Sequence, residues 1–177
     1  MNGSELCDYN KTRTIYQIGI VVFDIDKSVK EWVERYRVGP WTILTHSSEY
    51  LTDACIQPRA AENQWKFHVA LAMVGGLQIE LIQPVYGIPL YSDFLKAHGE
   101  GIHHFKEIMP DSELNATVES LQDKGIDILF GGNFYGARFY YPDTIPLFGI
   151  QVELGNGVSV QLPNTYTHRR IYPSDNE

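Results

Sequence analysis

Two short stretches near the middle of the chain carry residue types that could bind a metal ion. The first, Leu77–Pro84, alternates polar and apolar side chains like a β-strand and places Glu80 at its centre. An ionised carboxylate at such a position is costly unless it is exposed, paired or bound to a metal. The second stretch, Gly99–His104, ends in two adjacent histidines. We therefore predict that Glu80 and a histidine belong to a metal site.

Polar residues recur at matching places in the two halves of the chain, which indicates an internal duplication. The segment Gln17–Asp24 aligns with His104–Asp111, and both run from a polar residue to an aspartate that opens a helix. Likewise, Gln78-Ile-Glu80-Leu aligns with Gln151-Val-Glu153-Leu. Each half therefore contributes one distinctive polar residue from its first strand and one carboxylate from its last strand.

Strand parity places four of these polar side chains on one concave face. Side chains alternate across a strand, and the apolar neighbours of these residues are predicted to pack on helices. Two carboxylates, an imidazole and an amide oxygen suit a six-coordinate divalent ion with two open positions. The two carboxylates would otherwise repel each other, which also favours a cation. The predicted ligands are Gln17, Glu80, His104 and Glu153.

Three further polar residues are weaker candidates. The strand Lys66–Val74 is predicted to turn His68 and two alanines towards the interior, where the alanines leave room for a ligand. His68 is then either a structural histidine or a substrate contact. Arg138 is a candidate for binding a substrate carboxylate, and His103 is predicted to be packed or solvated rather than to bind metal.

The elements that must position these residues form an α+β fold of two tandem β-α-β-β-β modules, with a curved mixed sheet around a metal-binding cavity. The predicted strands are 16–23, 41–45, 66–74 and 77–83 in the first module and 102–109, 126–130, 137–141 and 149–154 in the second. Helices are predicted after Asp24 and Pro110, and 46–64 is predicted to be a loop. The expected segments are a polar lead at 1–14, a first module at 15–84, a linker with a short helix at 85–100, a second module at 101–163 and a tail at 164–177.

Composition excludes several classes of function. The chain has 177 residues, of which 44% are hydrophobic, and a net charge of -8. It has no basic cluster, so we expect neither a nucleic-acid nor a membrane partner. No apolar run approaches the length of a transmembrane span. Cys7 and Cys55 do not resemble a disulfide framework, so we expect a reduced, cytoplasmic protein.

The sequence resembles the vicinal oxygen chelate superfamily, which includes glyoxalases, bleomycin resistance proteins and dioxygenases and pairs two such modules around a metal. The string ELIQP, followed by Ser92–His104, is similar to methylmalonyl-CoA epimerases, and the resemblance covers roughly residues 15–155. It implies a homodimer and a divalent ion such as Zn, Co, Ni, Mn or Mg. It also places the four predicted ligands on the metal-binding positions of the superfamily.

The chain departs from its relatives at several positions. Epimerases of this kind usually carry His where this chain has Gln17, whereas glyoxalase I enzymes of the eukaryotic type share its Gln, Glu, His, Glu order. However, the positions at which glyoxalase I places glutathione-binding side chains hold Val21, Pro84 and Glu100. A glutathione thioester is therefore not the expected substrate. Lys106-Glu107 also departs from the small or apolar residues of relatives.

The resemblance and the ligand set predict an epimerase or isomerase that stabilises the enolate of a small acyl-CoA or oxo-acid substrate. Glu153 is the predicted proton-transfer base, with Glu80 on the opposite side of the substrate. The alternatives are a glyoxalase-like lyase acting on a non-glutathione substrate and a non-catalytic small-molecule binding module. A ring-cleaving dioxygenase would need two histidines and one carboxylate, a set that Gln17 breaks.

Overall fold

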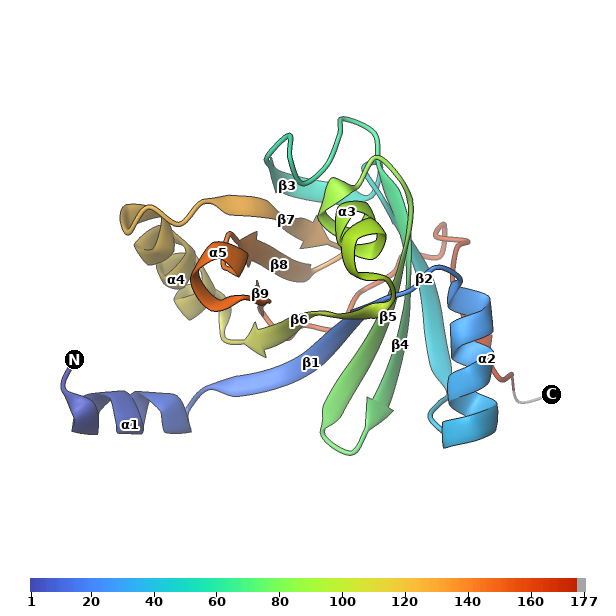
Figure 1. The fold of residues 1–177 in the computed structure, drawn as a ribbon, viewed down its shortest axis with the longest axis horizontal. Coiled ribbons are helices and arrows are strands. Elements are labelled where there is room, and N and C mark those ends of the chain that lie inside the picture. The colour runs from blue at the N-terminus through green and yellow to red at the C-terminus, as the bar shows by residue number, and fades with distance from the viewer. Residues whose placement is uncertain (175–177) are drawn as a thin grey trace.

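The chain folds into one curled mixed sheet with helices on its outer side and along its rim (Figure 1). The computed structural model describes residues 1–174, and within them the sheet has ten strands in the order β10-β2-β4-β5-β1-β6-β9-β8-β7-β3. This mixed α+β architecture confirms the predicted fold class. Within the same residues, no helix has the length and apolarity needed to cross a membrane.

The first module contains four strands and the helix α2. Its strands are β1 (Thr14–Val21), β2 (Trp41–Ser47), β4 (Lys66–Val74) and β5 (Leu77–Tyr86). Helix α2 (Ile25–Tyr36) begins where the Asp24 side chain accepts a hydrogen bond from the Lys27 backbone nitrogen at 3.0 Å. Its apolar face packs on the outer face of the sheet, so the opposite, concave face is left for a site.

The second module repeats this order. Its strands are β6 (Gly101–Ile108), β7 (Ile128–Phe134), β8 (Ala137–Pro142) and β9 (Gln151–Gly155), and its helices are α4 (Asp111–Asp123) and the short α5 (Ile145–Phe148). Helix α3 (Pro89–His98) lies in the linker. Strands β1 and β6 pair antiparallel and join the modules into one sheet.

The register confirms the duplication that the sequence predicted. Strand β1 pairs parallel with β5, with Gln17 opposite Gln78, and β6 pairs parallel with β9, with His104 opposite Gln151. Two residues along, Gly19 lies opposite Glu80, and Lys106 lies opposite Glu153. The two glutamates are therefore equivalent positions of the two modules.

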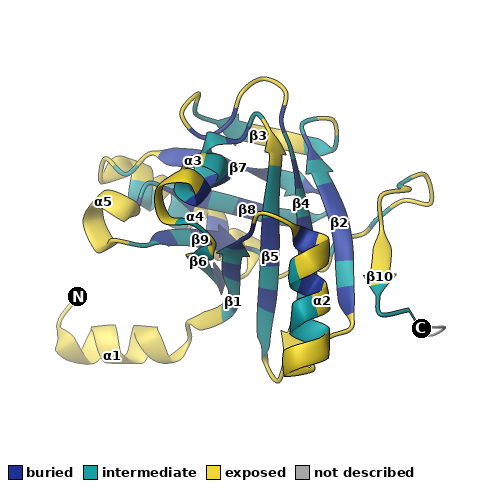
Figure 2. Cartoon of the chain, turned by 45° about the vertical axis from the view of Figure 1, so that its right-hand side comes forward, coloured by how far each residue is buried: buried dark blue, intermediate teal, exposed yellow. Residues whose placement is uncertain are grey.

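Four elements lie where none was predicted, and one of them is the short helix α5 between β8 and β9. Helix α1 (Gly3–Lys11) forms in the predicted lead and begins with a capping box between Asn2 and Glu5. Strand β3 (Leu51–Ile56) forms in the predicted loop and pairs with β7 of the other module. Strand β10 (Arg170–Tyr172) forms in the predicted loose tail and pairs with β2, while residues 175–177 of that tail lie outside the described residues. Both strands are largely exposed, so the sequence shows no alternation that would mark them (Figure 2).

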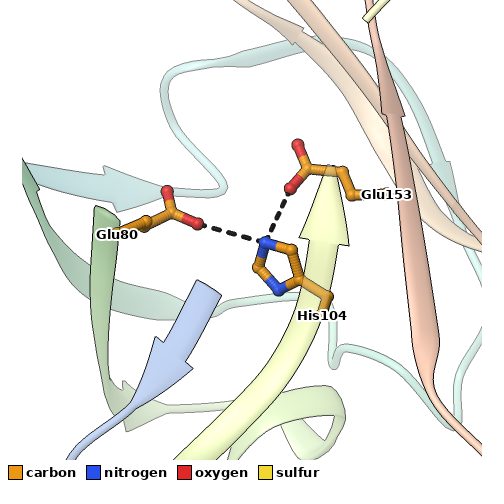
Figure 3. Close-up of side chains that lie close together, drawn as sticks. All are labelled: Glu80, His104 and Glu153. Atoms are coloured by element: carbon orange, nitrogen blue, oxygen red, sulfur yellow. Dashed lines mark ion pairs between the residues drawn. The ribbon is translucent and has the colours of Figure 1, made fainter. Parts of the chain in front are cut away.

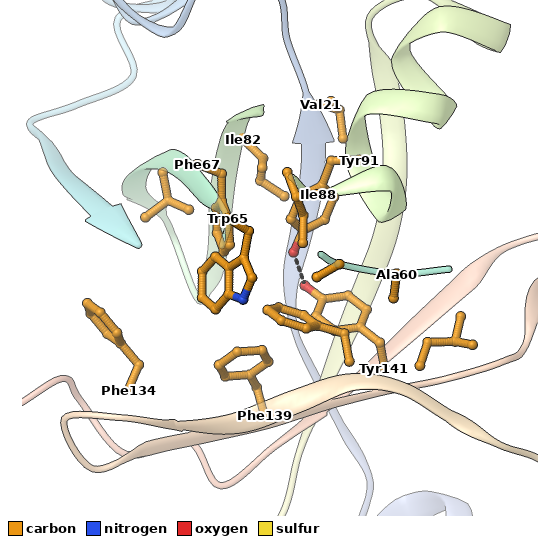
Figure 4. Packing of buried hydrophobic residues seen from close by; sticks show 14 of the residues in the cluster. Val21, Ala60, Trp65, Phe67, Ile82, Ile88, Tyr91, Phe134, Phe139 and Tyr141 are labelled. Carbon is orange, nitrogen blue, oxygen red and sulfur yellow. Dashed lines mark hydrogen bonds between the residues drawn. The ribbon is translucent and has the colours of Figure 1, made fainter. Parts of the chain in front are cut away.

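The core consists of two clusters, one on the outer face of the first module and one on the concave side that both modules share. One lies between the sheet and α2 and includes Ala70 and Ala72, and the other is largely aromatic and includes Phe67 and Val69 (Figure 4). The predicted orientation of β4 is therefore wrong, because its bulky residues face the concave side and its alanines face α2. Small side chains on that face let the helix approach the sheet closely.

Candidate metal centre

Three side chains from three strands converge on the concave side of the sheet (Figure 3). They are Glu80 on β5, His104 on β6 and Glu153 on β9, and their side chains are 13%, 0% and 5% exposed. His104 Nε2 lies 3.0 Å from Glu153 Oε2 and 3.3 Å from Glu80 Oε2. The structure thus brings together three of the four predicted ligands, one from the first module and two from the second.

A glycine on β1 makes room for this arrangement. Gly19 lies between Glu80 on one neighbouring strand and His104 on the other. A Cβ atom at position 19 would lie 2.0 Å from His104 Cε1, far inside any allowed contact. The imidazole therefore occupies the space that a side chain of β1 would otherwise fill, which brings its Nε2 close to both carboxylates.

The fourth predicted ligand, Gln17, lines the same cavity and is 3% exposed. Its Nε2 donates a hydrogen bond to Gln78 Oε1 at 2.7 Å. Its Oε1 is buried and has no hydrogen-bond partner within residues 1–174. A buried carbonyl oxygen without a partner is costly, and such an oxygen is a suitable ligand for a hard cation.

These residues fit a divalent ion. Ligand atoms bound about 2.1 Å from an ion and at right angles to each other lie about 3 Å apart, close to the two distances around His104 Nε2. That nitrogen has no hydrogen bond of acceptable geometry within the described chain, although two carboxylate oxygens lie next to it. One nitrogen and two carboxylate oxygens, with the free amide oxygen of Gln17 nearby on β1, form a mixed N/O donor set that suits several divalent metals.

Two buried tyrosines and a lysine hold Glu153. Tyr91 donates to the hydroxyl of Tyr141 at 3.0 Å (Figure 4). Tyr141 in turn donates to Glu153 Oε2 at 2.7 Å. Lys106 Nζ lies 2.8 Å from Glu153 Oε1. Burial acts to raise the pKa of Glu153, but the positive charge of Lys106 and the contact with His104 outweigh it and lower that pKa. Glu153 is therefore fixed in place and ionised.

His104 is held from behind by its neighbour in sequence. The Nδ1 atoms of His103 and His104 lie 3.2 Å apart, and the buried His103 ring packs against Tyr91 and Phe94. Burial, followed by the proximity of His104, lowers the pKa of His103 to about 3. Neutral His103 can accept the Nδ1 proton of His104, which leaves His104 Nε2 as the metal-facing nitrogen. Without an ion, burial lowers the pKa of His104, but the two carboxylates raise it to about 9.

The site opens into a cavity of about 790 Å³. Its apolar walls come from both modules and include Phe67, Phe134 and Phe139. His46 also lines the cavity and stacks between Phe67 and Phe134, at ring-centroid distances of 5.0 and 3.8 Å. Sequence reasoning did not single out His46, because it falls at the end of a strand that was predicted to stop at Thr45.

Lys106 and Tyr141 are two more site residues whose contacts the sequence did not give. Lys106 lies two residues after His104 on the same strand, so parity alone would have placed both on one face. Tyr141 lies in the predicted strand 137–141 with no pattern that distinguishes it from its neighbours. Its bond to Glu153 joins β8 to β9, and no spacing in the sequence marks it.

Two predicted substrate contacts lie elsewhere. His68 points away from the cavity, and its Nδ1 lies 3.0 Å from Thr45 Oγ1 beside a separate hollow of about 550 Å³. Arg138 does not line the cavity. Its guanidinium bonds to Asn115 Oδ1 at 2.7 Å, the Tyr140 hydroxyl at 2.9 Å and Asp111 Oδ1 at 3.2 Å.

Comparison with known proteins agrees with this geometry. A family model described as the Glyoxalase/Bleomycin resistance protein/Dioxygenase superfamily matches residues 16–141. The match spans more than half of the chain, so the protein belongs to this superfamily, as the sequence resemblance predicted. A comparison with curated protein sequences found no match.

Several solved structures share the fold. Methylmalonyl-CoA epimerase from Mycobacterium tuberculosis is 19% identical, with a TM-score of 0.58 over 82% of this chain and 88% of that one. A variant of Streptomyces coelicolor methylmalonyl-CoA epimerase in complex with 2-nitronate-propionyl-CoA is 20% identical, with a TM-score of 0.60 over 85% and 98%. A methylmalonyl-CoA epimerase in complex with methylmalonyl-CoA and NH4+ is 21% identical, with a TM-score of 0.58 over 84% and 97%. At these identities the likeness establishes the fold alone.

Proposed function

We propose that this protein is a metal-dependent epimerase or isomerase that moves a proton at the α-carbon of a small acyl-CoA or oxo-acid substrate. The observation that carries the proposal is the convergence of Glu80, His104 and Glu153 at the base of a large cavity. The four metal ligands in this proposal are these three residues and Gln17. The epimerase neighbours support the choice of reaction class within a superfamily that hosts several.

A bound divalent ion would act as a Lewis acid that polarises the substrate carbonyl and lowers the energy of the enolate. The chain's own residues move the proton. Glu153 accepts it, since Lys106 and Tyr141 hold this carboxylate in place and Lys106 keeps it ionised. Glu80 comes from the other module and passes a proton taken from solvent to the α-carbon from the opposite side, so that one proton leaves the substrate and one enters it. The apolar walls limit access of water to the carbanion.

A lyase acting on a non-glutathione substrate is a second form of the same chemistry. Glu100, at one of the positions where glyoxalase I binds glutathione, accepts a hydrogen bond from the Phe23 backbone nitrogen at 2.8 Å. This acidic side chain is therefore engaged with the protein backbone, which supports a substrate other than a glutathione thioester.

A third candidate, a non-catalytic small-molecule binding module, is favoured by one observation. Lys106 already provides a positive charge to Glu153, as a metal would. Such a module would bind its ligand without turnover and without a metal. The homodimer and the cytoplasmic location remain predictions, as do the substrate-binding roles of His68 and Arg138.

Metal content tests the ligand set. Purified protein should hold about one divalent ion per chain, and Glu80→Ala or His104→Ala, which remove a ligand atom outright, should remove most of it. The matched control is Glu119→Ala on the exposed face of α4, which should keep the metal. Full metal content in both site variants, measured by elemental analysis, would contradict the assignment.

Exchange of the substrate α-proton with deuterium tests the reaction. NMR of a panel of chiral 2-substituted acyl-CoA thioesters and 2-oxo acids should reveal a substrate that exchanges in D₂O only with the metal-loaded protein. Glu153→Gln should keep much of the metal, because its amide oxygen can still coordinate, and should slow exchange by about 10²–10⁴-fold. Undiminished exchange in that variant would assign proton transfer to another group. A ligand that binds tightly and never exchanges would favour the binding module.

A further inference from the structure

The Lys106 ammonium has donors to spare inside the cavity. Its side chain is 17% exposed, and Glu153 Oε1 is the one polar partner that residues 1–174 give its Nζ. An ammonium carries three N–H donors, so two remain for a ligand. A charged group that is mostly buried with two unused donors is unfavourable unless the cavity contents satisfy them.

The surrounding backbone is shaped to admit this lysine. A Cβ atom at Gly155 would lie 2.4 Å from Lys106 Cε and 3.2 Å from Nζ, so a glycine on β9 leaves the space through which the lysine reaches the cavity. In the first module the equivalent of Lys106 is Gly19. The ammonium therefore lies on one side of the metal centre only, so the second module places a positive charge there and the first module does not.

The charges around the cavity define the ligand that would fit. Glu80 and Glu153 offset a divalent ion, so Lys106 leaves one uncompensated positive charge at the metal centre. Beyond it, the walls combine aromatic and aliphatic side chains with neutral polar ones, and the exposed Arg169 is the other cation among the described residues that line the cavity. The metal centre therefore matches one negative group, and the aromatic walls match an apolar body. Arg169 alone would face the several phosphate charges of coenzyme A.

We propose that Lys106 binds the carboxylate of a small substrate with an apolar body, and that this substrate is not a coenzyme A thioester. The inference rests on the proposed function, because it assigns the substrate class of the same site. Lys106 acts here as a specificity residue: its charge-assisted hydrogen bonds hold the carboxylate next to the metal, while the aromatic walls take the rest of the molecule.

The test compares a carboxylate with its neutral isostere. Calorimetry on the metal-loaded full chain would measure binding of 3-phenylpropanoate and 3-phenylpropanamide to wild type, Lys106→Met and Lys106→Arg. Wild type should prefer the carboxylate. Lys106→Met should weaken carboxylate binding by about 10–100-fold, the range of a lost hydrogen bond to a charged group, and leave amide binding unchanged. Lys106→Arg should restore much of the preference.

A merely structural role for Lys106 would give a different pattern. Loss of support for Glu153 would weaken both ligands equally, so an unchanged carboxylate-to-amide ratio in Lys106→Met overturns the proposal. Failure of wild type to bind the carboxylate at millimolar concentration overturns it as well. The same holds if propionyl-CoA binds more tightly than 3-phenylpropanoate and its affinity is unchanged in Lys106→Met. Metal content and α-proton exchange on the same samples report separately on the proposed function. Loss of both, with the Lys106-dependent preference intact, would reject that function and keep the carboxylate site.

Discussion

The two modules share one topology but hold their polar residues very differently. In the second module, Glu153 contacts Tyr141, Lys106 and His104. In the first module, the equivalent Glu80 has only His104 as a polar partner among the described residues. The second module is therefore a prearranged, largely buried half-site, and the first supplies a less constrained carboxylate. Equivalent positions of the two modules therefore give the two carboxylates different environments.

A second pair of equivalent positions differs even more in polarity. Ile20 in β1 packs against the α2 cluster, whereas its counterpart Glu107 in β6 is 3% exposed. Arg13, just before β1, pairs with Glu107 through both Nε, at 2.6 Å from Oε1, and Nη2. This pairing accounts for a buried glutamate at a position where the sequence resemblance leads one to expect a small or apolar residue. It also ties the N-terminal segment to the second module.

The largest effect should come from separating this pair. Arg13→Met leaves the Glu107 carboxylate buried without its partner and should lower the free energy of unfolding by about 3–5 kcal/mol. Glu107→Ile copies the residue of the first module and should cost much less. Urea unfolding of both variants and the double variant would measure this, and the double variant should resemble Glu107→Ile. If Arg13→Met and Glu107→Ile lower the free energy of unfolding equally, the buried Glu107 carboxylate does not depend on Arg13 as described.

A smaller effect should come from adding a methyl group at the two glycines that admit His104 and Lys106. Neither glycine needs a positive φ, so the effect of alanine is purely steric. Gly19→Ala forces the buried imidazole aside and should cost about 1–3 kcal/mol, with loss of metal affinity. Gly155→Ala meets chiefly a flexible lysine stem, with the Arg138 backbone oxygen 3.1 Å from the new Cβ, and should cost less while keeping the metal. Thermal unfolding and elemental analysis would reveal a reversed order, which would contradict the tight fit around His104.

The last expected effect is absent at neutral pH and appears only in acid, as a change in pH dependence where the modules meet. Burial, together with the charge of Lys106 and against that of Glu153, lowers the pKa of His46 to about 3. Below pH 6.5 the unfolded chain therefore binds a proton that the folded chain does not, and stability falls as the pH falls towards 3. His46→Phe keeps a ring between Phe67 and Phe134 and should reduce this slope by about 1.4 kcal/mol per pH unit.

Urea unfolding between pH 4 and 6 would measure that slope. Parallel stability curves of the two proteins above pH 6.5 serve as the internal control, because His46 is neutral there in both the folded and the unfolded state. An unchanged slope below pH 6.5 would show that His46 gains a proton in the folded protein.

The sequence by itself determined the repeated unit and most of the candidate metal centre. Period-two alternation and the matched Gln-x-Glu pairs are local properties, so they survive without knowledge of the fold. They predicted that Glu80, His104 and Glu153 share a face, and the register of β5, β6 and β9 shows why this works. The helix caps were equally local, as Asp24 illustrates.

Only the tertiary structure decided which face of a strand is concave and which distant groups meet. Alternation determines that neighbouring side chains point to opposite sides of the strand. Which side faces the cavity depends on the helix that covers the other side, and for this reason His68 lies outside the cavity and Phe67 inside it. The pairing of β3 with β7 and the chain from Tyr91 through Tyr141 to Glu153 depend on the curl of the whole sheet. Such contacts join residues far apart in the chain, and no local pattern encodes them.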